Sequence, residues 1–156
     1  MTYRPVPKER NVKLSILINI IMAYKIIDIQ GIGEVYAAKL IAVGIETVPQ
    51  LLEKGKTPKG RKEIEDATGI RHDLVLTWVN HADLFRVKGI GPQFSELLEA
   101  AGVDTVKELA TRNAKNLEAK MIEVNEKENR VKRVPTAGEL QKMIDQAKGM
   151  PAVVTY

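Results

Sequence analysis

Apolar residues recur along most of this chain at intervals of three and four, which is the spacing of one face of an α-helix. The clearest stripe lies in residues 72–84, where Leu74, Val75, Trp78, Val79 and Ala82 are apolar. No segment alternates convincingly between apolar and polar residues, as a half-buried strand would. The pattern therefore predicts an all-α protein with Trp78 in its core.

Start and stop signals divide the rest of the chain into further predicted helices. Capping boxes begin at Thr47, Thr105 and Thr136, and C-terminal glycines stand at Gly44 and Gly102. The predicted helices, in chain order, cover 34–43, 47–52, 61–67, 72–84, 92–101, a short stretch from 105, a stretch from 113 or 116, and 135–149. Between them we expect a loop over 54–60, a charged connector over 126–133 and, after the last helix, a tail or surface strand over 151–156.

The chain contains an internal repeat in which position i matches position i + 58. Gly31-Ile32-Gly33 aligns with Gly89-Ile90-Gly91, and the match continues without a gap as far as Leu51 and Leu109. Repeats of this kind fix the architecture of a fold, because each copy is one structural unit. We therefore predict two copies of a small helical module, in residues 23–83 and 84–149, with a tail over 150–156.

The N-terminal extension, residues 1–22, ends in an apolar run, Leu14–Met22. This run is shorter than the roughly 20 apolar residues that a membrane-spanning helix needs. One interpretation is an element packed on the first repeat, and another is a signal segment, although no small-residue cleavage site follows. A third is that Met22 is the biological start and residues 1–21 lie upstream of it.

Composition and charge narrow the classes of function. The chain has 156 residues, two of them histidines. It has no cysteine, and this absence excludes disulfides, thiolate metal sites and cysteine nucleophiles. Aromatic residues make up 4%, which argues against a stacking platform for single-stranded nucleic acid. The net charge of +4 divides into +3 for residues 1–22, −1 for 23–83 and +2 for 84–156. The repeated body is nearly neutral, so bulk charge alone does not indicate a nucleic-acid partner.

The repeated Gly-Ile-Gly turn has a chemical consequence. Glycines allow positive φ and close backbone approach, and each turn leads directly into a predicted helix. The first N–H groups of that helix have no partner within the helix and lie at its positive end. A phosphate fits such a site without help from any side chain.

These turns resemble the helix-hairpin-helix motifs of DNA-repair and recombination proteins, with residues 26–43 and 82–101 as the better copies. The segments around Thr68-Gly69-Ile70 and Asn129-Arg130-Val131 resemble degenerate partners that complete each unit. In such proteins the turn amides contact a DNA phosphate without reading the sequence, often with help from a nearby Lys or Arg. The run from Gly31 to Ala147 resembles a narrower group, the uncharacterised family catalogued as domain of unknown function 4332. That family implies the fold and no activity.

Two groups of residues are candidates for contact with a nucleic-acid backbone. The turn residues are Gly31, Gly33, Arg86, Lys88, Gly89, Ile90, Gly91 and Gln93, and the densest basic run is Lys54, Lys56, Lys59, Arg61 and Lys62. The second turn is the better candidate, because acidic Glu34 follows the first. Arg130, Lys132 and Arg133 form another basic group. Solvated surface is the default interpretation of both basic groups, and contact with a nucleic-acid backbone is the alternative. His72 and His81 are expected at the surface, too far apart to share a metal.

No nucleophile has an evident base, and there is no phosphate loop ending in Gly-Lys-Ser/Thr. The leading hypothesis is therefore a cytoplasmic, non-enzymatic protein without catalytic residues, metal or cofactor. It would bind nucleic-acid backbone without sequence preference, DNA being favoured over RNA by the resemblance alone. The alternative is a protein-interaction or scaffold module. We expect no membrane partner, and an exported or anchored form is the third hypothesis.

Overall fold

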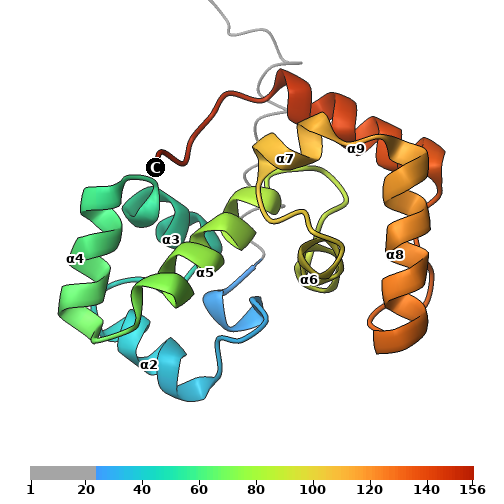
Figure 1. Ribbon diagram of the computed structural model, residues 1–156. Helices are drawn as coiled ribbons and strands as arrows, with labels where there is room; N and C mark the ends of the chain where they lie inside the picture. The colour runs from blue at the N-terminus through green and yellow to red at the C-terminus, as the bar shows by residue number, and fades with distance from the viewer. Residues whose placement is uncertain (1–23) are drawn as a thin grey trace, which may run out of the picture.

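The computed structural model describes residues 24–156, and within them the fold is all-α (Figure 1). The predicted N-terminal extension, including the run Leu14–Met22, lies outside the described residues. The helices are α2 (Glu34–Ala42), α3 (Val48–Gly55), α4 (Pro58–Thr68), α5 (His72–Leu84), α6 (Pro92–Ala100), α7 (Val106–Thr111), α8 (Ala114–Glu128) and α9 (Ala137–Gly149). A short 3-10 turn, η1 (Ile26–Asp28), precedes them, and Lys25 forms an isolated antiparallel bridge with Thr47.

The internal repeat is present in the backbone. Helices α2 and α6 begin and end at equivalent positions of the two copies, and α3 and α7 begin at equivalent positions. Gly31 and Gly89 have φ values of 91° and 94°, which L-amino acids with side chains rarely adopt. Thr47 and Thr105 each accept a hydrogen bond from the backbone N–H three positions on. The predicted capping box is complete at Thr47, whereas at the second site Glu108 accepts the Asp104 N–H instead of that of Thr105. The same sequence pattern therefore gives the same local structure twice.

Helix α5 belongs to the cores of both repeats. It packs on α3 and α4 on one side and on α6 and α7 on the other, and Figure 1 shows it between these two groups. Trp78 is buried, as predicted, and its ring lies edge-on to Tyr36 of α2. The prediction that His81 lies at the surface is wrong, since its side chain is 2% exposed and contacts Ser95 and Glu99 of α6.

Helix α2 packs only one of its two apolar sides into the core. Ala37 and Leu40 face the core, whereas Val35 and Ile41 are 70% and 50% exposed. The helix is apolar on both sides, so its pattern does not show which side packs inward. In the corresponding helix α6, Leu97 and Leu98 are both fully buried.

The predicted loop over 54–60 is much shorter in the structure. Helix α3 ends at Gly55 and α4 begins at Pro58, capped by Thr57, whose hydroxyl accepts the Gly60 N–H at 3.0 Å. Gly55 and Gly60 lie in these helices, where the lack of a side chain allows close packing. A Cβ on Gly60 would lie 1.9 Å from the Lys54 carbonyl oxygen, and one on Gly55 would lie 2.4 Å from Val79.

The C-terminal residues return from the second repeat to the first. They cross from α9 toward α3 and α4 without forming a strand (Figure 1). The Thr155 N–H donates to the Lys56 carbonyl at 2.8 Å, and the Tyr156 hydroxyl donates to Asn80 Oδ1 at 2.7 Å. Arg61 donates to the Thr155 carbonyl at 2.7 Å, so these residues connect the two repeats. Across residues 24–156, no helix is both long enough and apolar enough to cross a bilayer.

Candidate nucleic-acid interface

The second Gly-Ile-Gly turn joins the end of α5 to α6 through a hydrogen-bonded loop. Ile90 donates its N–H to the Val87 carbonyl at 3.1 Å, and its side chain is buried. Gly91 is the N-cap of α6, and the first intrahelical bond runs from Ser95 N–H to the Gly91 carbonyl at 2.9 Å. The N–H groups that precede Ser95 in the helix therefore have no acceptor within it. Pro92 has no N–H, and within residues 24–156 the amides of Gly91, Gln93 and Phe94 at this positive end donate no hydrogen bond.

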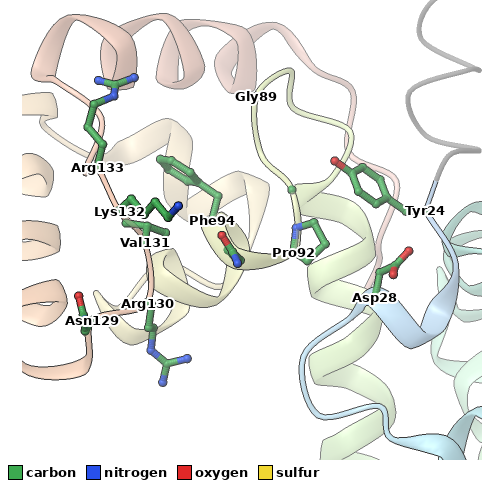
Figure 2. A pocket seen from close by; sticks show the side chains of 12 residues that line it. Tyr24, Asp28, Gly89, Pro92, Phe94, Asn129, Arg130, Val131, Lys132 and Arg133 are labelled. Carbon is green, nitrogen blue, oxygen red and sulfur yellow. The ribbon is translucent and has the colours of Figure 1, made fainter.

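This turn forms one wall of an open groove of about 950 Å³. The opposite wall is the connector between α8 and α9, and Tyr24 and Asp28 of the first repeat lie at one end (Figure 2). The residues that line it are Tyr24, Asp28, Gly89, Gly91, Pro92, Gln93, Phe94, Asn129, Arg130, Val131, Lys132 and Arg133. Helix-end amides and three basic residues thus line one concave surface, and both kinds of group are suited to binding an anion.

Asn125, near the end of α8, holds the basic wall in place. Its Oδ1 accepts the N–H groups of Arg130 and Val131 at 2.9 and 3.0 Å, and its Nδ2 donates to the Val131 carbonyl at 3.0 Å. Asn129, the C-cap of α8, turns the chain with a φ of 50°, a value that asparagine tolerates better than most residues. Asn125 therefore fixes the backbone of the connector at Arg130 and Val131.

Two of these three cations are already paired with carboxylates. Arg130 contacts Glu96 of α6 and Glu128 of α8, and Arg133 binds Glu139 through two hydrogen bonds of 2.7 and 3.0 Å. The bond from Arg133 lowers the pKa of Glu139 to about 2. Lys132 is exposed, and no carboxylate of the described residues forms an ion pair with it. Lys132 therefore carries the least neutralised positive charge in the groove.

Tyr24 closes the end of the groove near the turn. Its ring packs against Phe85, with centroids 5.2 Å apart. A Cβ on Gly91 would lie 3.0 Å from the Tyr24 hydroxyl, which is tighter than ordinary van der Waals contact. Glycine at 91 thus leaves room for this hydroxyl beside the free amides of α6. The carboxylate of Asp28 accepts the Lys25 N–H at 2.9 Å and adds a negative charge at the same end.

The structure brings some of the predicted residues of the second turn to the groove. Gly89, Gly91 and Gln93 line it, and Lys88 lies next to it with its backbone N–H donated to Gln146 at 3.1 Å. Arg86 is directed elsewhere, because its guanidinium pairs with Asp83 and its side chain is only 14% exposed. Burial raises the pKa of Asp83, and the neighbouring Arg86 opposes that rise.

The first turn and the basic run lie in the other repeat and do not line the groove. Gly31 and Gly33 are exposed at the start of α2, and Glu34 is the first residue of that helix. Within the basic run, Lys54 caps the Val43 carbonyl at 3.2 Å and Arg61 is buried. The other three lysines are at least partly exposed, and Lys56 and Lys62 pair with Glu53 and Asp66, whereas Lys59 is exposed on α4.

The chain was also compared with known proteins. Residues 30–150 match the profile of a family described as Domain of unknown function (DUF4332). The chain belongs to that family. The search of curated proteins and the search of solved structures found no match. In this DUF4332 chain the matched residues include both Gly-Ile-Gly turns and the whole α8–α9 connector, so the groove falls within the family region except for Tyr24 and Asp28.

Sequence reasoning did not assign these two residues, nor Phe94, to a site. Tyr24 and Asp28 precede the first turn, and nothing in their spacing connects them to the second turn, which belongs to the other repeat. The sequence shows Arg130, Lys132 and Arg133 as a basic group, but it does not show that they are neighbours of Gly89–Gln93. The similarity of 129–131 to a second hairpin was the available signal, since paired hairpins pack side by side.

Proposed function

We propose that this protein binds nucleic-acid backbone without sequence preference, through helix-hairpin-helix units formed by the two repeats. The observation that carries the proposal is the groove, where the free amides of α6 face the basic α8–α9 connector. Amides bind a phosphate oxygen directly, and the flanking cations add charge-assisted hydrogen bonds. Groups of this kind contact phosphate and sugar and carry no sequence information.

The second repeat is the principal binding unit in this proposal. Its turn has Lys88 before it and Lys132 across the groove, whereas the first turn is followed by Glu34 and by exposed Val35. Duplex DNA is the preferred partner, because the resemblance to DNA-repair hairpins implies it. In this proposal the protein acts without catalysis, metal or cofactor, by binding the nucleic-acid backbone.

A protein-interaction module is the second candidate, and one observation favours it. Val35 and Ile41 on α2 are large apolar side chains with 70% and 50% exposure, beside the first turn. Apolar surface of this kind suits a protein partner better than a phosphate backbone. In this alternative the hairpins hold the fold together and the groove has no nucleic-acid role.

Fluorescence anisotropy with labelled oligonucleotides separates the two candidates. Duplex DNA, single-stranded DNA and duplex RNA of one length are titrated with the protein at several salt concentrations. The proposal predicts binding to duplex DNA whose log–log salt slope is about −2 to −4, because each neutralised phosphate contributes about −0.9. An absence of binding to all three at low salt, with roughly 100 μM protein, contradicts the nucleic-acid proposal.

A further inference from the structure

Among the residues of 24–156 that line the groove, Asp28 is the only acidic one. It is exposed at the end of η1, and its Oδ2 accepts the Lys25 N–H at 2.9 Å. No lysine, arginine or histidine of the described residues forms an ion pair with it. The negative charge of Asp28 therefore has no neutralising partner in this part of the chain, whereas two of the three cations in the groove are paired.

The groove is basic on one side and acidic on the other. Figure 2 shows the three basic residues of the connector on one side of Pro92, and Asp28 with Tyr24 on the other side. Helix α6 begins at Pro92, so its free amides lie between these two sides. A phosphate on the amides therefore has cations to one side and a carboxylate to the other, and the carboxylate repels any further phosphate.

A carboxylate beside a phosphate site favours a ligand that can donate a hydrogen bond to it. An ionised carboxylate only accepts hydrogen bonds, and such a bond from a hydroxyl group is short and strong. The backbone of a continuous DNA strand offers no hydroxyl, because both linking sugar oxygens of each nucleotide are esterified to phosphate. A hydroxyl group is present where a strand ends, on the terminal sugar. The charge pattern of the groove therefore fits the end of a strand better than the middle of one.

We propose that the groove binds a hydroxyl end of a DNA strand. The last phosphodiester contacts the α6 amides and Lys132, and the hydroxyl of the terminal sugar donates a hydrogen bond to Asp28. This proposal rests on the proposed function, and it narrows the ligand from nucleic-acid backbone in general to a strand end at a break or a duplex terminus. The 3′ and 5′ ends present the same hydroxyl chemistry, and the experiment has an arm for each.

Dumbbell DNA provides the test, because loops close both ends of the duplex and every strand end then lies at a central gap of one nucleotide. Four fluorescent dumbbells are titrated with the wild-type protein by anisotropy. One is continuous, and the gaps of the other three carry a 3′-hydroxyl with a 5′-phosphate, a 3′-phosphate with a 5′-hydroxyl, or two phosphates. We expect one hydroxyl-bearing gap to bind at least about tenfold more tightly than the continuous DNA and the gap with two phosphates. The preferred gap identifies the 3′ or the 5′ end.

Two variants with the same change in charge test the role of Asp28. Asp28→Asn keeps an oxygen for the Lys25 N–H and removes the charge, whereas Asp66→Asn removes a charge from an exposed position of α4 outside the groove. Asp28→Asn should reduce the preference for the hydroxyl-bearing gap to less than roughly threefold, and Asp66→Asn should keep it. Circular dichroism shows whether both variants are folded, and the wild-type series tests the proposal without either of them.

Several results would overturn the proposal. Equal binding of continuous and gapped DNA by the wild-type protein would do so and would leave backbone binding in place. So would a preference that Asp28→Asn retains, because the carboxylate would then not be the acceptor. A continuous RNA dumbbell bound as tightly as the preferred gap would assign the contact to an internal 2′-hydroxyl instead. An absence of binding to every dumbbell would contradict the proposed function as well.

Discussion

Lys54 and Arg112 occupy equivalent positions of the two repeats, and both donate a hydrogen bond to a carbonyl at the end of a repeated helix. Lys54 Nζ lies 3.2 Å from the Val43 carbonyl oxygen after α2, and Arg112 lies 2.8 Å from that of Gly102 after α6. A cation at the C-terminal end of a helix stabilises it through the helix dipole and the unpaired carbonyls. A lysine that the sequence offered as a nucleic-acid contact thus has a structural role that its counterpart shares.

The first prediction concerns these two caps. Lys54→Met and Arg112→Met should each lower the free energy of unfolding by about 0.3–1 kcal/mol, because each removes a cation from a helix C-terminus. Urea denaturation followed by circular dichroism measures the change. Lys59→Met, at an exposed position, is the control and should have a smaller effect. Loss of stability in neither cap variant would contradict the shared role.

Substitution of Gly89 and substitution of Gly33 should have different effects on the stability of the fold. Gly89→Ala should destabilise the fold by about 1–2 kcal/mol, since its φ of 94° is unfavourable for a residue with a Cβ, which would also meet Met143 at 3.0 Å. Gly33→Ser should be neutral or stabilising by a few tenths of a kcal/mol, because Gly33 is an N-cap with open space around it. Thermal unfolding of both variants tests this difference, and an equal loss in both would contradict it.

Arg61 should contribute to the stability of the fold, although the sequence analysis places it in a basic run that could contact nucleic acid. Its guanidinium is buried and donates to the carbonyls of Gly55 and Thr155 at 2.9 and 2.7 Å. Arg61→Met should cost about 2–3 kcal/mol, because two charged hydrogen bonds are lost and the Gly55 carbonyl is left without its partner in a buried site. Urea denaturation measures this loss, and Lys62→Met at the exposed neighbouring position is the control. A change below roughly 0.5 kcal/mol would be inconsistent with the contacts described.

The ion pair of Arg133 and Glu139 should make stability depend on pH. The pKa of Glu139 is lowered to about 2, so its contribution to stability is complete above the ordinary glutamate pKa and is lost as the pH falls toward 2. Glu139→Gln keeps the capping-box geometry but removes this titration. The stability of the wild-type protein should therefore fall more steeply than that of the variant between pH 5 and 2. Parallel curves would show that the pair contributes nothing.

The same variant should bind nucleic acid more tightly. Glu139 neutralises Arg133 at the edge of the groove, and its replacement by Gln leaves the guanidinium free for a phosphate. We expect a several-fold lower Kd for duplex DNA at low salt, measured by anisotropy at neutral pH. Weaker or unchanged binding would mean that Arg133 does not face the bound strand.

Much of the fold follows from local sequence signals, because these act over short stretches of chain. The positive-φ glycines, the threonine caps and the internal repeat are all visible in the amino-acid sequence alone. The orientation of α2 and the burial of His81 are not, since both depend on which helix packs on which. An isoleucine at 41 and a histidine at 81 give no indication of their neighbours in space.

The groove illustrates a second limit on prediction from sequence. Its walls come from residues 24–28, 89–94 and 129–133, which only tertiary packing brings together. Sequence identified the turn and the basic connector separately, each with its own chemistry. The sequence did not show that the turn and the connector lie close together. It also did not show that the carboxylates of Glu96, Glu128 and Glu139 neutralise two of the three cations. The charge of the site is therefore smaller than the count of basic residues implies.

The most direct test of the nucleic-acid proposal is a matched pair of charge reversals. Lys132→Glu places a negative charge in the groove. Lys115→Glu places one at an exposed position of α8, about 20 Å along the helix axis from the end that leads into the connector. Both change the net charge equally, so they differ only in position. Duplex DNA binding is measured by anisotropy over a range of salt concentrations for both variants and the wild-type protein.

The account predicts that Lys132→Glu weakens binding at least about tenfold and reduces the magnitude of the salt slope by about one, as the loss of one phosphate contact requires. Lys115→Glu should change affinity by less than roughly threefold and leave the slope unchanged. Equal effects of the two variants would show that any binding reflects overall charge, and an absence of DNA binding by the wild-type protein would contradict the proposal outright.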